Sequence, residues 1–208
     1  MELSAEEIRV LGCLVEKEAT TPDVYPLSTN ALLLACNQRS SRDPVVAYDE
    51  GVVTQAMMSL RERGLARTAR GDGSRVYKHA HLLREALALD GAELAVLSVL
   101  MLRGPQTAGE LRTRTERQHA FSSLDEVEAT LERLARRDPP FVRQLERRPG
   151  QKEARWTHLL GGTQAAEPAA AVVPVSAGGE QPLARELAEL RAEVAELRER
   201  LEALERRL

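Results

Sequence analysis

Polar and basic side chains that could contact nucleic acid are concentrated between residues 37 and 79. A helix predicted over residues 49–63 would present Thr54, Gln55 and Ser59 on its outward face, where they could hydrogen-bond to base edges of duplex DNA. Basic residues around that helix could hold the phosphate backbone, namely Arg39, Arg42, Arg63, Arg67, Arg70, Arg75 and Lys78. The alternative is that these cations form an ordinary solvated surface.

Charge is distributed unevenly along the chain. The formal net charge is −3, yet residues 61–79 hold six basic residues against two acidic ones, and residues 133–155 hold eight against three. Cationic segments of this kind attract phosphate. A helix predicted to begin near Ser122 instead exposes Asp125, Glu128 and Glu132, which would repel phosphate in a groove. We therefore expect the second half of the chain to touch only the DNA backbone, or to bind protein.

Residues that could support catalysis or metal binding lack the partners that such chemistry needs. His79 and His81 would share one face of a strand, but no third metal ligand lies near them in sequence. The run Gly71-Asp72-Gly73-Ser74 lacks the lysine and hydroxyl ending of a phosphate-binding loop. Cys13 and Cys36 have neither a Cys-x-x-Cys partner nor an evident base, which is typical of buried thiols. We predict no enzymatic activity, no metal and no cofactor.

The composition is typical of a folded, mainly helical protein. Apolar residues make up 43% of the 208 residues and charged residues 29%, which excludes a wholly disordered chain. Aromatic residues make up only 3%, so stacking platforms for single-stranded nucleic acid are missing. No apolar run reaches the roughly 18 residues of a membrane span, and the acidic start lacks the features of a signal peptide. We expect no membrane contact and a cytoplasmic location.

Three helices followed by a hairpin are predicted in the first 82 residues. The third helix ends at Gly64, and strand-like runs over residues 65–70 and 75–79 flank a turn at residues 71–74. The signals that begin the three helices are Ser4 with Glu7, Ser28, and Asp49. Three helices and a hairpin are the elements of a winged helix.

The same order of elements then repeats. Strand-like runs over residues 141–147 and 153–158 flank Arg148-Pro149-Gly150-Gln151, which suits a type II turn. The helix signals before them are Asp90 with Glu93, Thr107 with Glu110, and Ser122. An internal duplication of one unit predicts both the fold and the boundary between the units.

The predicted fold is mainly α with small β-hairpin wings, in the α+β class, with two winged-helix domains in tandem and a C-terminal coiled-coil helix. The expected parts are winged-helix domain 1 (residues 1–82), winged-helix domain 2 (83–160), a flexible Ala/Pro/Gly linker (161–182) and the coiled-coil helix (183–208). Residues 94–102 are apolar nearly all round, so we expect the two domains to pack together. The joining segment, residues 80–89, is predicted to be helical.

Apolar residues of the first helix allow a different function. Val10, Cys13 and Leu14 lie off its main apolar stripe, and they would either pack against the second domain or receive a protein partner. In the second case the chain would be a winged-helix interaction or scaffold module without direct DNA contact.

The C-terminal segment carries a heptad pattern. Its apolar residues alternate spacings of four and three, and they are Leu183, Leu187, Leu190, Val194, Leu197, Leu201, Leu204 and Leu208. Three pairs of opposite charge at the g and e′ positions favour a parallel homodimer, although the same charges could pair within one solvated helix.

Several motifs resemble those of the bacterial YceH-type family of uncharacterised proteins. They are Gly12-Cys13-Leu14-Val15-Glu16-Lys17, Thr20-Thr21-Pro22, Tyr25-Pro26-Leu27-Ser28, Ala35-Cys36-Asn37-Gln38, Leu102-Arg103-Gly104-Pro105-Gln106-Thr107 and Gly109-Glu110-Leu111-Arg112. The resemblance implies a tandem winged-helix fold with a C-terminal coiled coil. It implies no activity and no binding residues.

Overall fold

The computed structural model describes residues 2–70, 76–147 and 153–162, all of which belong to one compact unit, residues 1–166. A second unit, residues 167–208, lies outside the described residues. The predicted coiled-coil helix lies there too. The predicted linker, apart from Gly161 and Gly162, both hairpin turns and Arg75 are likewise outside the described part of the chain.

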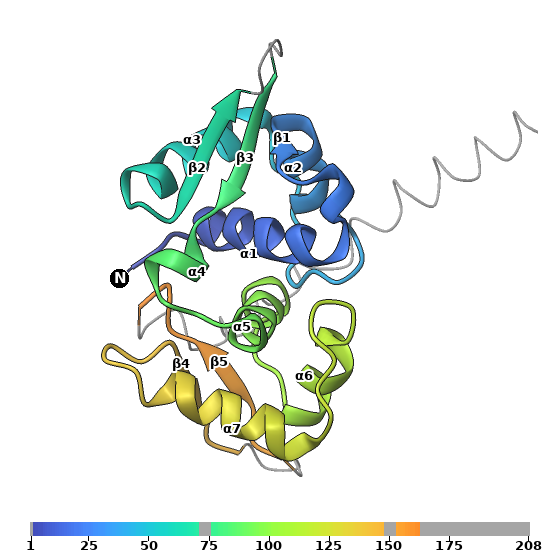
Figure 1. Ribbon diagram of the computed structural model, residues 1–208, viewed down its shortest axis with the longest axis vertical. Coiled ribbons are helices and arrows are strands. Elements are labelled where there is room, and N and C mark those ends of the chain that lie inside the picture. The colour runs from blue at the N-terminus through green and yellow to red at the C-terminus, as the bar shows by residue number, and fades with distance from the viewer. Residues whose placement is uncertain (1, 71–75, 148–152, 163–208) are drawn as a thin grey trace, which may run out of the picture. The chain divides into compact units, whose positions relative to one another are not determined.

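The first half of the described unit combines helices with a three-stranded antiparallel sheet (Figure 1). The predicted capping box is present, because Ser4 Oγ accepts from the Glu7 amide and the Glu7 carboxylate accepts from the Ser4 amide. Ser28 and Asp49 cap the next two helices as predicted. The elements are α1 (Ala5–Thr20), the 3-10 helix η1 (Pro22–Val24), β1 (Leu27–Ser28), α2 (Thr29–Cys36), α3 (Glu50–Glu62), β2 (Ala66–Arg70) and β3 (Tyr77–His81).

The second half repeats this order with a smaller sheet. Both predicted capping boxes are present, and Ser123 caps the third helix instead of Ser122, whose hydroxyl contacts Glu126. The elements are α4 (Leu83–Ala86), α5 (Gly91–Arg103), α6 (Ala108–Thr115), α7 (Leu124–Ala135), β4 (Val142–Gln144) and β5 (Trp156–His158). Over the described residues, the chain is therefore a mixed α+β fold with seven α-helices and two small antiparallel sheets.

Antiparallel pairing just before the second helix occurs in both halves and was not predicted. In the first half β1 pairs with β3, so the strand order is β1-β3-β2. In the second half Gln106 makes the corresponding antiparallel bridge to Trp156. Two residues are too short a run for periodicity to indicate a strand.

The two halves pack together through α1 and α5, as the apolar sequence of residues 94–102 predicted (Figure 1). Gly12 of α1 permits the close approach, because a Cβ atom there would lie 3.0 Å from Leu102 Cγ and 3.1 Å from Met101 Cβ. Val10, Cys13 and Leu14 are fully buried in this core. These three side chains are therefore not exposed to a protein partner, and their packing against the second half stays a prediction.

The segment that joins the halves differs from its prediction. Residues 80–89 were expected to be helical, but β3 continues through His81 and the helix covers only Leu83–Ala86. Ala80 and His81 are buried beside β2, and Leu82 donates to the Leu65 carbonyl at the end of the same ladder. Tertiary burial in the sheet outweighs the local helical preference.

Candidate nucleic-acid interface

Two of the three predicted base-contacting residues are exposed on helix α3. Val53, Ala56, Met57 and Leu60 are buried, while Thr54 and Gln55 are exposed and Ser59 is half-buried. The spacing of the buried residues at three and four positions accounts for this division. Ser59 Oγ accepts from Arg63 Nε at 3.4 Å, so this hydroxyl is already engaged within the helix.

The turn after α3 leads directly into the hairpin. Gly64 has φ +70°, the left-handed conformation that ends a helix most readily when no Cβ is present. The Leu65 amide then donates to the Leu60 carbonyl at 2.9 Å, which brings the chain back beside the helix and into β2. This turn therefore connects the end of α3 directly to the β2–β3 hairpin.

Three of the predicted phosphate-contacting residues lie on the hairpin. Arg67 and Arg70 on β2 are exposed and Lys78 on β3 is half-buried. Lys78 pairs with Ala69 across the ladder and Arg70 with Tyr77. The Arg70 guanidinium lies 4.4 Å from the centre of the Tyr77 ring, a cation–π contact. Over the described residues, none of the three cations forms an ion pair with a carboxylate.

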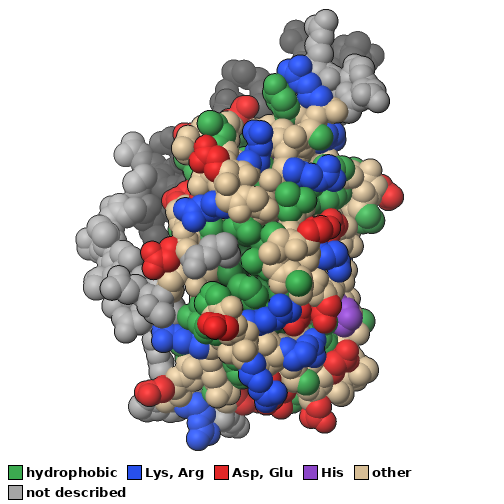
Figure 2. All heavy atoms as spheres, turned by 60° about the vertical axis from the view of Figure 1, so that its left-hand side comes forward, with side chains coloured by type: hydrophobic (Ala, Val, Ile, Leu, Met, Phe, Trp, Pro, Cys, Tyr) green, Lys and Arg blue, Asp and Glu red, His purple; other side chains and the backbone are tan. Residues whose placement is uncertain are grey.

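Figure 2 shows the side of the molecule on which α3 and β2 lie. Basic and acidic side chains are interspersed over much of this face, and its upper end, near the tip of the hairpin, carries basic and hydrophobic side chains. The hairpin is therefore a local cationic feature and not part of a face of uniform charge.

Arg63 is partly committed to the fold. Its Nε lies 3.4 Å from Glu7 Oε1, the carboxylate of the α1 capping box, although 42% of the Arg63 side chain remains exposed. Arg39, in contrast, is exposed after the end of α2.

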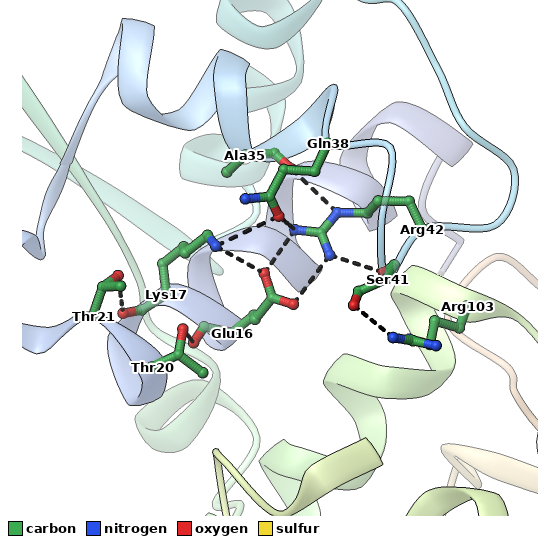
Figure 3. A network of polar contacts seen from close by, with 9 residues as sticks. All are labelled: Glu16, Lys17, Thr20, Thr21, Ala35, Gln38, Ser41, Arg42 and Arg103. Carbon is green, nitrogen blue, oxygen red and sulfur yellow. Dashed lines mark hydrogen bonds and ion pairs between the residues drawn. The ribbon is translucent and has the colours of Figure 1, made fainter.

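The prediction that Arg42 contacts phosphate is wrong, because its side chain is buried within the first half (Figure 3). Its guanidinium donates to both Glu16 carboxylate oxygens at 3.0 and 2.6 Å, to Gln38 Oε1 and to the Ala35 carbonyl. Burial acts to raise the pKa of Glu16, but the bond from Arg42 and its charge hold that pKa below the ordinary value. Ser41 continues the network, since its hydroxyl accepts from Arg103 of α5.

The two histidines of β3 serve the fold. His79 lies between two hydroxyls, with Thr29 Oγ1 2.9 Å from Nε2 and Thr68 Oγ1 3.0 Å from Nδ1. His81 Nδ1 accepts from the Leu83 amide, and its Nε2 lies 3.0 Å from Glu18 Oε2. Burial lowers the pKa of both rings. The described residues contain no group of three or more His, Cys, Asp or Glu arranged to hold a metal ion.

Basic residues of the second half are largely engaged in internal contacts. Glu93, in the α5 capping box, lies 3.6 Å from Arg133 and 3.3 Å from Arg137. Glu110, in the α6 capping box, contacts Arg114 and Arg155. The acidic residues predicted on the outer face of α7, namely Asp125, Glu128 and Glu132, are exposed.

Exposed apolar side chains at the candidate interface, among them Met58 and Tyr77, had no predicted role. Met58 of α3 is 49% exposed and Tyr77 of β3 is 51% exposed. The helical period places Met58 beside Thr54, so its position was available from the sequence. The Arg70–Tyr77 contact depends on strand register, which the residue pattern alone did not determine.

Comparison with known proteins identifies the family. Residues 3–151 match the family described as "Protein of unknown function, DUF480". The chain belongs to the DUF480 family. The match covers the first half and the second half as far as residue 151, before β5, and the description of DUF480 names no activity. The resemblance drawn from the motifs is confirmed at this level, and the YceH-type name stays a prediction.

Curated relatives of this DUF480 protein carry the name UPF0502. The chain is 55% identical to one from Opitutus terrae over 177 residues, which are 83% of this chain and 77% of the relative. It is 57% identical to one from Pelobacter propionicus over 162 residues (78% and 74%), and 51% identical to one from Azoarcus sp. over 203 residues (95% and 90%).

Over the described part of the chain, no helix combines the length and the apolar composition that crossing a bilayer requires.

Proposed function

We propose that each half of the described unit is a winged helix and that the first half binds duplex DNA. In this arrangement α3 enters the major groove and the β2–β3 hairpin lies along the phosphate backbone. The order of three helices and a hairpin supports the winged-helix assignment, as does its repetition after α5. The exposed polar residues of α3 support its placement in the groove.

One observation carries the proposal: the hairpin cations have no carboxylate partners in the described structure. Arg42, Arg133 and Arg137 all have carboxylate partners within the fold. Arg67, Arg70 and Lys78 form no such pair, so their charge is available to an external anion. This difference favours a phosphate-binding role over a merely solvated surface.

The test measures binding of a random-sequence duplex by fluorescence anisotropy at two salt concentrations. Replacing Arg67, Arg70 and Lys78 by Ala should weaken binding to every duplex and should reduce the slope of log K against log salt by about 2 to 3. A matched variant replaces Arg112, Arg117 and Arg147 of the second half by Ala and changes the net charge equally. Its affinity for the duplex should fall less. Equal losses in both variants would contradict the proposed role of the hairpin.

We also propose that the chain forms a homodimer through residues 183–208, on the strength of their heptad pattern. Two DNA-binding units on one dimer would gain avidity, and a linker of about 20 residues would let them reach sites of variable spacing. Removal of residues 183–208 should halve the mass measured by light scattering. An unchanged mass would refute the dimer assignment.

The second candidate function is that of a protein scaffold, and the α1 face that most specifically supported it is not at the surface. Val10, Cys13 and Leu14, the face considered for a partner, are fully buried. DNA binding through the first half is therefore the function that we propose.

A further inference from the structure

The first two turns of α3 present an outward face without a cationic side chain. Thr54, Gln55 and Met58 are exposed, and Gly51 is exposed one turn earlier. Gly51 adds no side chain, so a nucleic acid can approach the helix backbone closely at this point. Asp49 uses its carboxylate to accept from the Val52 amide at 2.9 Å.

Each of these side chains fits a particular base. A glutamine amide can donate to adenine N7 and accept from adenine N6 in the major groove. Apolar groups contact the thymine methyl, and both the Thr54 methyl and the half-exposed Met58 side chain are such groups. Guanine is read mainly by Arg or Lys through its O6 and N7 acceptors, and neither residue lies on this part of α3.

The arginines of α3 and its C-cap lie at the other end of the helix. Arg61 is in the last turn, and Arg63 is directed toward Glu7 and Ser59 by the contacts described above. Glu50 is the exposed charge of the first turn, and a carboxylate accepts from the cytosine amino group. Glu50 therefore opposes selection of A·T pairs, while three side chains favour it.

We infer that α3 selects A·T base pairs in the major groove, with Gln55 on adenine and with Met58 and Thr54 on thymine methyl groups. The inference rests on the proposed function and makes Met58 a specificity-determining residue. One bidentate contact corresponds to a preference of about 5- to 150-fold for the correct base.

The test compares duplexes of equal length made of A·T, G·C or I·C pairs. Inosine presents the same major-groove acceptors as guanine but lacks its minor-groove amino group, so an I·C duplex separates the two grooves. Readout by α3 predicts preference for A·T with I·C bound as weakly as G·C. Binding of I·C as strong as that of A·T would instead assign the preference to the minor groove, where narrow A·T tracts attract arginine, and would overturn the inference.

Three variants sharpen the test. Gln55→Ala and Met58→Ser should each reduce the A·T preference at unchanged affinity for G·C, and Gln55→Arg should shift selection from adenine toward guanine. Arg67→Ala is the control, because it should weaken all duplexes alike. Equal binding of A·T and G·C by the unmodified chain, or no shift with Gln55→Arg, would overturn the inference and leave DNA binding intact. Absence of binding to every duplex would overturn the proposed function as well.

Discussion

The two halves of the described unit share one order of elements but use their basic residues in different ways. In the second half, arginines after and within α7 bind the carboxylate of the α5 capping box, Glu93. In the first half, Arg63 after α3 makes the equivalent contact with Glu7. The first half then adds Arg67, Arg70 and Lys78 on the hairpin, which have no such carboxylate among the described residues.

The two halves therefore share the arginine contact to the capping-box glutamate, and they differ in the cations of the hairpin. In both halves an arginine just after the third helix contacts the capping-box glutamate of the first, so this contact belongs to the fold. The unpaired cations occur on a longer hairpin, with five residues in each strand against three in the second half. The basic segments of the two halves look alike in sequence, but their side chains have different physical roles.

The largest expected effect distinguishes buried from exposed arginine within the first half. Arg42→Ala should lower the free energy of unfolding by about 3 kcal/mol, because it removes the bidentate guanidinium from the buried Glu16 carboxylate and leaves it only Lys17, at 3.4 Å. Arg39→Ala, at an exposed position of the same loop, should change it by less than about 0.5 kcal/mol. Urea denaturation of both variants measures the difference, and similar values would place Arg42 at the surface.

The second prediction concerns a histidine of the second half. Burial lowers the pKa of His158 to about 4, so the unfolded chain takes up a proton near pH 6.5 that the folded chain takes up only near pH 4. Stability is therefore retained above pH 6.5 and is lost as the pH falls toward 4. Between pH 7 and pH 5 this ring should cost about 2 kcal/mol.

His158→Gln and His158→Leu provide the measurement. In either variant, the loss of unfolding free energy between pH 7 and pH 5 should be smaller than in the unmodified chain by about 2 kcal/mol. His79 and His81 shift in the same direction and remain in both variants, so part of the acid sensitivity should persist. An unchanged pH dependence would mean that His158 is accessible to solvent.

The smallest effect compares one arginine from each half directly. Arg137 donates to the Leu87 and Ala88 carbonyls and to Glu93, so Arg137→Ala should destabilise the fold by about 1 kcal/mol. Arg67→Ala should leave stability within about 0.5 kcal/mol of the unmodified chain. Thermal unfolding of the two variants tests this order, and a larger loss from Arg67→Ala would show that the hairpin cation stabilises the fold.

Much of the local structure was predictable because its signals lie within a few residues of one another. The capping boxes at Ser4, Asp90 and Thr107 are each formed by residues three apart. The buried and exposed faces of α3 follow from helical period, so Thr54 and Gln55 were placed correctly. The strand β1 and the extent of β3 were missed, because pairing across the sheet and not local propensity formed them.

The sequence by itself determined the order of the helices, their capped ends and the duplication of the unit, since each depends on spacings of two to four residues. Only the tertiary structure decided which of the described arginines have a carboxylate partner. Arg42 meets Glu16, Arg63 meets Glu7 and Arg137 meets Glu93 over separations of 26, 56 and 44 residues. An ion pair depends on distance in space, and chain folding brings these charges together without leaving a local pattern in the sequence.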